Sequence, residues 1–205
     1  MMDLVLKHIP EIAMTAAMAW GAGLRMYLVV FVVGLAGYFG YVPLPDSMKI
    51  ISHPAVMGAS GFMAFVEFFA DKIPYLDSMW DGIHTFLRIP AGAALAAGMM
   101  GGNGDAVSMV AAILGGTLAA GTHFGKAGTR AVVNTSPEPF SNVGTSLAEE
   151  GMLLGGLGLA MTSPWLFLAL LLVFIVAVVI LLGVFIRAIR KLMRRKEATG
   201  SLKPI

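Results

Sequence analysis

"PWLFLALLLVFIVAVVILLGVFI", residues 164–186, is the stretch that decides the class of this protein, because its 23 residues carry no charge. A helix needs about 20 apolar residues to cross roughly 30 Å of hydrocarbon at about 1.5 Å per residue. The same helix in a water-soluble protein would need a large core around it. The stretch therefore predicts a transmembrane helix.

The composition of the whole chain agrees with a membrane protein. Of its 205 residues, 58% are hydrophobic and 13% are charged, with a mean hydropathy of +0.83. Soluble domains carry roughly 25% charged residues. Cysteine is absent, which excludes a disulfide framework, a thiolate metal site and a catalytic cysteine. The N-terminus shows no basic region followed by a cleavage site, so we expect it to be retained.

Six basic side chains follow the last apolar run: Arg187, Arg190, Lys191, Arg194, Arg195 and Lys196. The positive-inside rule predicts that this tail, 187–205, lies in the cytoplasm. Lipid headgroups and nucleic acid also attract basic tails, but we interpret this one as a topology anchor. We expect the lipid bilayer as a partner, and no nucleic acid.

Five further apolar segments predict an all-α integral membrane protein, a single domain of about six spans: 26–41, 53–70, 87–101, 106–122, 146–161 and 164–186. Gly21 and Gly23 predict a break between a short first helix and the first span. An even number of spans places both termini on one side. Six spans also suggest two inverted three-helix repeats with broken or re-entrant segments, although the sequence shows no convincing internal repeat. The Gly- and Ala-rich segments 91–102 and 111–121 predict close helix packing, inside the protein or in a homo-oligomer.

The first charged region, 67–88, follows the second predicted span. After Pro74, a helix would place Asp77, Asp81, His84 and Arg88 in one stripe, which we interpret as an amphipathic helix at the membrane surface. Glu67 lies inside the end of the span, where a central charge would cost about 2.5–3.5 kcal/mol. We expect it to pair with Lys72, Arg25 or Arg130. A cation or proton site and a structural ion pair both remain open.

The second charged region, 122–151, is either a re-entrant loop or a cytoplasmic loop. His123, Lys126 and Arg130 have near-helical spacing and would either bind an anion or serve as positive-inside charges. "SLAE" (146–149) matches a capping box that would start the fifth span and turn Glu150 inward. No enzyme motif and no close pair of histidines occurs, so we expect no enzyme and no cofactor, and the sequence assigns no metal.

Four segments resemble a bacterial integral-membrane family known as domain of unknown function 4126: "GLRMYLVV" (23–30), "EFFADKIPYLDS" (67–78), "LRIPAGAAL" (87–95) and "KAGTRAVVNTSPEPFSN" (126–142). The resemblance implies a multi-pass protein of about this length in the bacterial inner membrane, and it implies no activity. "EFFADK" is also similar to the acid-Gly-Asp-Lys/Arg signature of Golgi-type manganese/calcium exchangers. Here Ala70 replaces the glycine and no second copy occurs, so this similarity only favours cations among the substrates.

Three functions remain open. The first is a transporter or channel for a small ion, either a cation or a proton-coupled solute, whose central site is formed by Glu67, Asp71, Lys72, Arg130, Asn134 and Glu138. Secondary candidates are Arg25, Asp77, Asp81, His84, Arg88, His123, Lys126, Asn142 and Glu150. The second is a lipid-phosphate binding or flipping protein that uses Lys126, Arg130, Arg25 and Arg88. The third is a structural membrane subunit that docks through 91–121.

Overall fold

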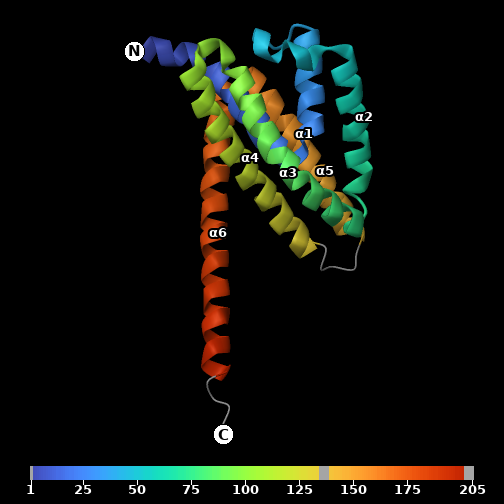
Figure 1. Ribbon diagram of the computed structural model, residues 1–205, viewed down its shortest axis with the longest axis vertical. Helices are drawn as coiled ribbons and strands as arrows, with labels where there is room; N and C mark the ends of the chain where they lie inside the picture. The colour runs from blue at the N-terminus through green and yellow to red at the C-terminus, as the bar shows by residue number, and fades with distance from the viewer. Residues whose placement is uncertain (1, 134–138, 201–205) are drawn as a thin grey trace. The chain divides into compact units, whose positions relative to one another are not determined.

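The computed structural model describes residues 2–133 and 139–200, and these form six α-helices and two short 3₁₀ helices, with no strand (Figure 1). The elements are α1 (Met2–Tyr38), η1 (Asp46–Ser52), α2 (Pro54–Ala70), α3 (Pro74–Met99), η2 (Gly101–Asn103), α4 (Asp105–Val133), α5 (Pro139–Thr162) and α6 (Pro164–Gly200). Proline opens four of the helices, since its missing N–H costs nothing in the first turn. The all-α prediction is confirmed for the described part of the chain.

Helix α1 reverses direction at Arg25, whose backbone is not helical (φ −150°, ψ 85°). A Cβ atom on Gly21 would lie 2.7 Å from Val29 Cγ2, although a straight helix separates positions eight residues apart by about 12 Å along its axis. Both arms consequently end at the same end of the bundle as η1 and η2. There Asn103 Nδ2 donates to Glu11 Oε1 (2.6 Å) and Ser52 Oγ donates to the Gly34 carbonyl (2.9 Å). A break in this helix was predicted at Gly21 and Gly23, and it is found at Arg25.

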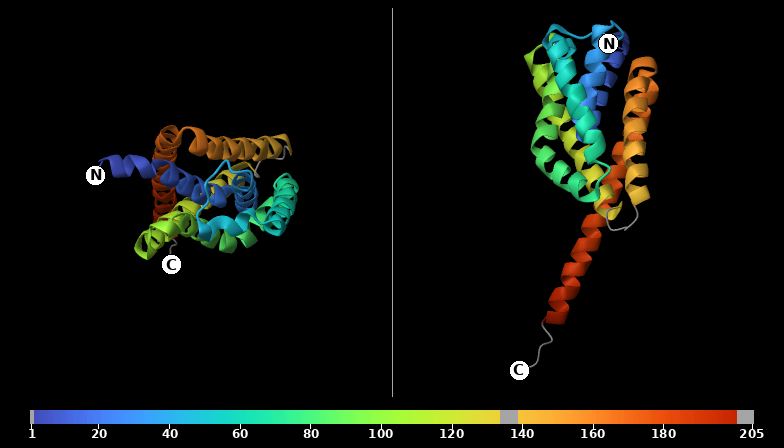
Figure 2. Two further views of the ribbon diagram at one scale, coloured as in Figure 1. Left: turned by 90° about the horizontal axis from the view of Figure 1, so that it is seen from above. Right: turned by 90° about the vertical axis from the view of Figure 1, so that its right-hand side faces the viewer.

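Helix α1 packs against α2, α3, α4 and α5 within the compact unit formed by residues 1–168 (Figure 2). Glycines bring the helices close together. A Cβ atom on Gly115 would collide with the Ala96 side chain, and one on Gly92 would collide with Ala119. The small residues of α3 and α4 therefore do face another helix, while the homo-oligomer stays a prediction. Residues 169–205 form a second compact unit, which contains most of α6.

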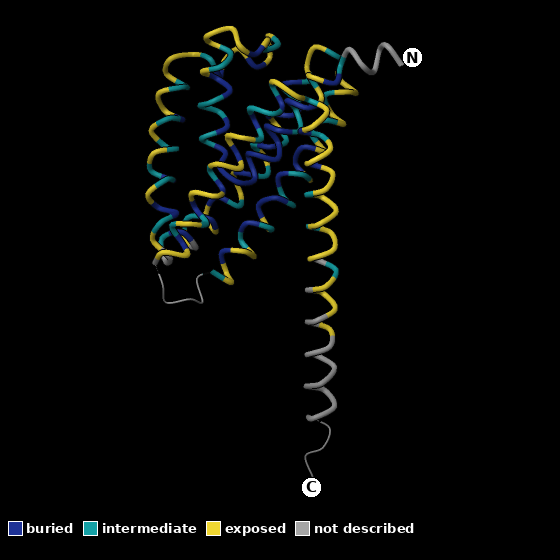
Figure 3. The backbone as a smooth tube through the Cα atoms, turned by 180° about the vertical axis from the view of Figure 1, so that it is seen from behind, coloured by how far each residue is buried: buried dark blue, intermediate teal, exposed yellow. Residues whose placement is uncertain are grey.

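The first unit buries many charged and polar side chains beside an apolar core and exposes many large apolar side chains. Figure 3 marks the buried and exposed parts of the backbone. The buried side chains include Arg25, Glu67, Asp71 and Arg88, whereas large apolar side chains such as Phe62 are exposed. This distribution suits a lipid environment. By length and composition, three helical segments can cross a membrane, namely 8–38, 105–133 and 164–181, and Pro54–Ala70 is a shorter apolar helix. These findings suggest a membrane protein, while the count of six spans and the inverted repeat stay predictions.

The interpretation of the stripe on α3 as part of an amphipathic helix at the membrane surface was wrong. The predicted polar stripe (Asp77, Asp81, His84 and Arg88) is buried, and Ile83, Phe86 and Leu87 on the other side are exposed. A helix in a water-soluble protein or at a membrane surface turns its polar stripe to water. A helix in contact with lipid turns the same stripe toward other protein groups, because hydrocarbon cannot solvate charge.

Candidate ion-binding site

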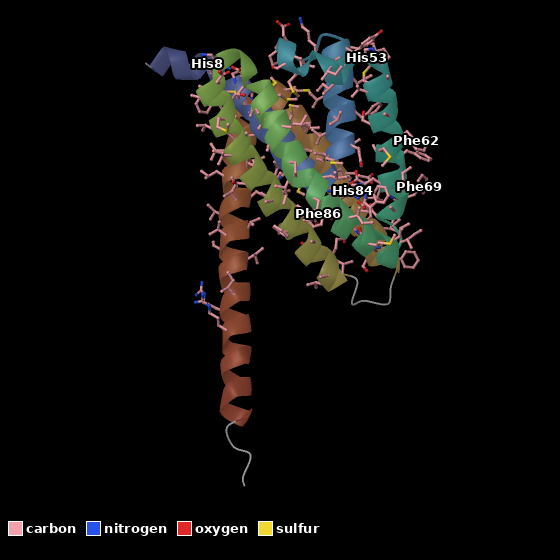
Figure 4. All side chains as sticks on the ribbon, viewed as in Figure 1. His8, His53, Phe62, Phe69, His84 and Phe86 are labelled. Atoms are coloured by element: carbon pink, nitrogen blue, oxygen red, sulfur yellow. The ribbon has the colours of Figure 1, made fainter. Side chains whose placement is uncertain are left out.

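Charged and polar side chains from α1 to α5 meet in one buried ionic cluster. Its members are Arg25, Glu67, Asp71, Lys72, Asp77, Asp81, His84, Arg88, His123, Lys126, Arg130, Asn142, Ser146, Glu149 and Glu150. The regions 67–88 and 122–150, which are far apart in sequence, therefore lie together. Figure 4 labels His84 among the clustered sticks and Phe62 on the outer side of α2.

The kink in α1 places Arg25 in this cluster. Its Nη2 lies 2.6 Å from Asp71 Oδ2 and 3.1 Å from Glu150 Oε1, and it donates to Ser146 Oγ at 2.9 Å. The kink also makes the Leu24 carbonyl available as an acceptor for Lys126 Nζ at 3.4 Å. One break in the helix thus supplies both a cation and a backbone acceptor.

Glu67 pairs with Arg88, so the expected partners Lys72, Arg25 and Arg130 were wrong. Arg88 Nη2 lies 2.6 Å from Glu67 Oε1, and Arg88 Nη1 lies 2.6 Å from Asp81 Oδ1. The Glu67 and Arg88 side chains are both 0% exposed. The chain turns back between α2 and α3, and this turn brings Arg88 opposite Glu67, 21 residues earlier in the sequence.

Two histidines form hydrogen bonds within the cluster through both ring nitrogens. Arg88 Nη1 donates to His123 Nδ1 (3.3 Å), so a neutral ring donates from Nε2 to Thr85 Oγ1 (2.7 Å). His84 Nδ1 donates to the Trp80 carbonyl (2.8 Å), and its Nε2 shares a hydrogen bond with the Tyr27 hydroxyl (3.3 Å). The acceptor role of His123 Nδ1 suits a neutral imidazole, which adds no charge to the cluster.

Lys126 and Arg130 connect α4 to its neighbours. Lys126 Nζ lies 3.1 Å from Asp71 Oδ2, 3.4 Å from Asp81 Oδ1 and 3.7 Å from Glu149 Oε2. Arg130 forms a two-pronged pair with Glu149, at 3.1 and 2.9 Å, and also donates to Asn142. Both cations are therefore already paired with carboxylates, which disfavours the anion-site interpretation.

Helix α5 starts at Pro139, so the capping-box interpretation of "SLAE" was wrong. Ser146 and Glu149 lie inside the helix and belong to the cluster, where the sequence interpretation had given them only a capping role. Their spacing from Asn142, at i+4 and i+7, was a signal of one shared helix face. Glu150 does turn inward, toward Arg25 and toward Lys72 Nζ at 3.6 Å. Asn134 and Glu138 lie outside the described residues.

Asp77 differs from the other carboxylates in the described part of the cluster. It is 0% exposed, neither of its oxygens has a hydrogen-bond partner there, and its ion-pair contact is Arg130 Nε at 3.9 Å. Asp77 lies in the first turn of α3, outside the three candidate spans. Burial raises its pKa to about 6, with Arg130 opposing the shift and Asp81 and Asp71 adding to it.

The charges of the described cluster do not quite balance. Six carboxylates (Glu67, Asp71, Asp77, Asp81, Glu149 and Glu150) face five cations (Arg25, Lys72, Arg88, Lys126 and Arg130). If all are ionised, a single negative charge remains. Binding one proton or one monovalent cation would neutralise it.

Three of these carboxylates could also meet at a metal ion. Asp71, Asp77 and Asp81 each offer an oxygen, and the three oxygens lie within 4.8 Å of one another. Arg25 and Lys126, however, already contact Asp71 at 2.6 and 3.1 Å. Asp81 is likewise paired with Arg88 and Lys126, so of these three Asp77 alone offers a loosely held carboxylate. One carboxylate supplies at most two of the roughly six oxygen ligands that a divalent ion such as Ca²⁺ or Mg²⁺ takes. The arrangement therefore favours a proton over a divalent metal.

The family model of a domain of unknown function (DUF4126) matches residues 12–183, which include the whole cluster. The chain belongs to this family. No curated protein and no solved structure matches the chain. Because membership in DUF4126 carries no activity, function has to be argued from the cluster itself.

Proposed function

We propose that this DUF4126 protein is a multi-pass membrane transporter that binds a proton at Asp77 and carries it across the membrane, alone or coupled to a small solute. One observation carries the proposal: Asp77 is a fully buried carboxylate without a hydrogen-bond partner in the described cluster. A buried carboxylate without hydrogen bonds favours its neutral, protonated form.

The paired groups around Asp77 support a different role for Glu67. Glu67 lies 2.6 Å from Arg88, and we assign this contact as a structural ion pair that holds α2 against α3 beside the site. The loosely held carboxylate of Asp77 can gain and lose a proton without breaking such a pair. This assignment moves the centre of the site from Glu67 to Asp77.

Protonation of Asp77 can affect the rest of the cluster through Arg130. That guanidinium contacts Asp77 on α3, the Asp71 carbonyl after α2 (3.2 Å), and Glu149 on α5. Neutralising Asp77 weakens one side of this junction and shifts Arg130 toward Glu149. A movement of α3 relative to α4 and α5 is the conformational step that we connect to transport.

The topology we propose has α1 as a re-entrant helical pair with Arg25 at its tip, followed by five crossings in α2 to α6. The crossing in α3 lies in the predicted span 87–101, so Asp77 stands at the membrane boundary. Both arms of α1 end beside η1 and η2, which supports this arrangement. The basic tail supports a cytoplasmic C-terminus in a bacterial inner membrane. The N-terminus then lies on the opposite side.

Proton flux into proteoliposomes tests the proposal. Purified wild-type protein, Asp77→Asn and the control Asp46→Asn are reconstituted with a pH-sensitive dye inside and a proton gradient across the membrane. Asp46 is an exposed surface acid whose side chain is 92% exposed. Wild type and Asp46→Asn are expected to dissipate the gradient, whereas Asp77→Asn is not.

Circular dichroism of each variant shows whether a loss of flux reflects a loss of folding. A silent wild-type protein, or full flux through a folded Asp77→Asn variant, would overturn the proposal. The first of these results would favour a non-transporting membrane subunit.

A further inference from the structure

An apolar groove of about 400 Å³ lies between the second arm of α1, α2 and α5. Its volume falls within the roughly 300–1,000 Å³ of small-molecule sites. It is lined by Leu28, Phe31, Gly61, Ala64, Phe65, Phe68, Phe69 and Leu154, and by the charged residues Arg25 and Glu150. Asp77 does not line the groove, although Arg25 and Glu150 at its charged end also belong to the ionic cluster.

The groove combines apolar walls with charge at one end. Along α2 its lining runs from Gly61 to Phe69, which corresponds to about 12 Å of helix. Arg25 contacts Asp71, which caps the end of α2, so the charged residues lie near the Phe69 end. A ligand that fits must therefore have an apolar chain and a polar head.

The head-group end carries charges of both signs. Lys72 Nζ lies 3.0 Å from the centre of the Phe68 ring and 3.6 Å from Glu150 Oε1, so it stands at the rim of the groove. The Lys72 and Glu150 side chains are 19% and 15% exposed, whereas Arg25 is buried against Asp71. The two accessible charges therefore form one positive and one negative contact point.

From these features we infer that the groove binds one acyl chain of a membrane phospholipid with a phosphoethanolamine head group. The head-group ammonium donates to Glu150, the phosphate pairs with Lys72, and the chain lies along α2 against Phe31 and Phe65. Phosphatidylglycerol would place its phosphate on Lys72 in the same way, but its glycerol offers Glu150 only hydroxyl groups and no positive charge. A choline head group has no N–H to donate.

Lipid retention by the full-length protein tests this assignment. Protein in detergent is equilibrated with equal amounts of phosphatidylethanolamine, phosphatidylglycerol and phosphatidylcholine, and bound lipids are counted by native mass spectrometry. Loss of a charge-assisted hydrogen bond lowers affinity by about tenfold, so wild type is expected to retain the ethanolamine lipid preferentially and Glu150→Gln to lose that preference. Equal retention of the three lipids by wild type, or a preference for phosphatidylglycerol, would overturn the inference.

A matched pair of variants on α2 tests the groove itself. Ala64→Phe fills it, while Ala59→Phe adds the same side chain at an exposed position outside it. Ala64→Phe is expected to reduce retention of the ethanolamine lipid about tenfold relative to Ala59→Phe, since a filled groove removes the chain contacts. Equal retention by the two variants would show that the lipid binds elsewhere. Proton flux is measured separately, so failure here leaves the proposed transport role standing.

Discussion

Replacing Arg88 with Met removes the cation that holds two buried carboxylates at once. Arg88 lies 2.6 Å from both Glu67 and Asp81, and its side chain is 0% exposed. Removing one partner of a buried pair costs about 3–5 kcal/mol, because it leaves an uncompensated charge. Asp81 keeps a second cation, Lys126, at 3.4 Å, so most of the penalty falls on Glu67.

The double variant Arg88→Met/Glu67→Gln removes the stranded charge as well. We expect Arg88→Met to lose about 3–5 kcal/mol and the double variant to recover about half of that loss. For a chain of this size 1 kcal/mol shifts the melting temperature by roughly 2–4 °C, so the single variant should melt about 6–20 °C lower. Thermal unfolding in detergent, followed by tryptophan fluorescence, measures both shifts.

The exposed pair Lys49–Asp46 provides the control, since both side chains are at least 70% exposed. Lys49→Met is expected to change the melting temperature by less than about 4 °C, because exposed pairs contribute roughly 0–1 kcal/mol. If Arg88→Met behaves like Lys49→Met, or if adding Glu67→Gln worsens its stability, the reading of a closed structural pair is refuted.

The sequence predicted the helical class and the break in α1, because both depend on local signals. The charge-free run 164–186 is long enough to cross a bilayer, and the glycines before Arg25 weaken the helix at that point. It also marked most of the members of the cluster as candidates. It did not predict the orientation of α3, because amphipathic periodicity shows that a polar stripe exists and leaves open whether the stripe faces water or protein. The Glu67–Arg88 pair depends on how α2 and α3 come together, which spacing along one helix does not reveal.

Three further predictions follow from packing, charge and topology. Gly23→Ala is expected to destabilise the protein by about 1–3 kcal/mol, because the added Cβ atom would lie 2.8 Å from Thr122 Cβ. Gly155→Ala should not destabilise it, since the space around Gly155 is open. Thermal unfolding compares the two variants. Asp77 has a pKa raised from 3.8 to about 6, so its ionisation in the unfolded chain erodes stability as pH rises between these values. Asp77→Asn should therefore melt above wild type at neutral pH and lose that advantage near pH 3.8, and an unchanged difference across the range would contradict the shift. Because the chain lacks cysteine, single variants Met2→Cys and Gly200→Cys can be labelled with a membrane-impermeant reagent. Labelling from opposite sides is expected, and labelling from one side would support six spans instead.

The protonation of Asp77 can be measured directly by infrared difference spectroscopy of the purified protein between acidic and neutral pH. A protonated carboxyl group absorbs apart from carboxylates, and in the wild-type protein this band is expected to appear with a midpoint near pH 6. Asp77→Asn should lack it, while the exposed control Asp46→Asn should retain it. If the band is absent from wild type, or persists in Asp77→Asn, then Asp77 does not bind the proton and the account of this site is wrong.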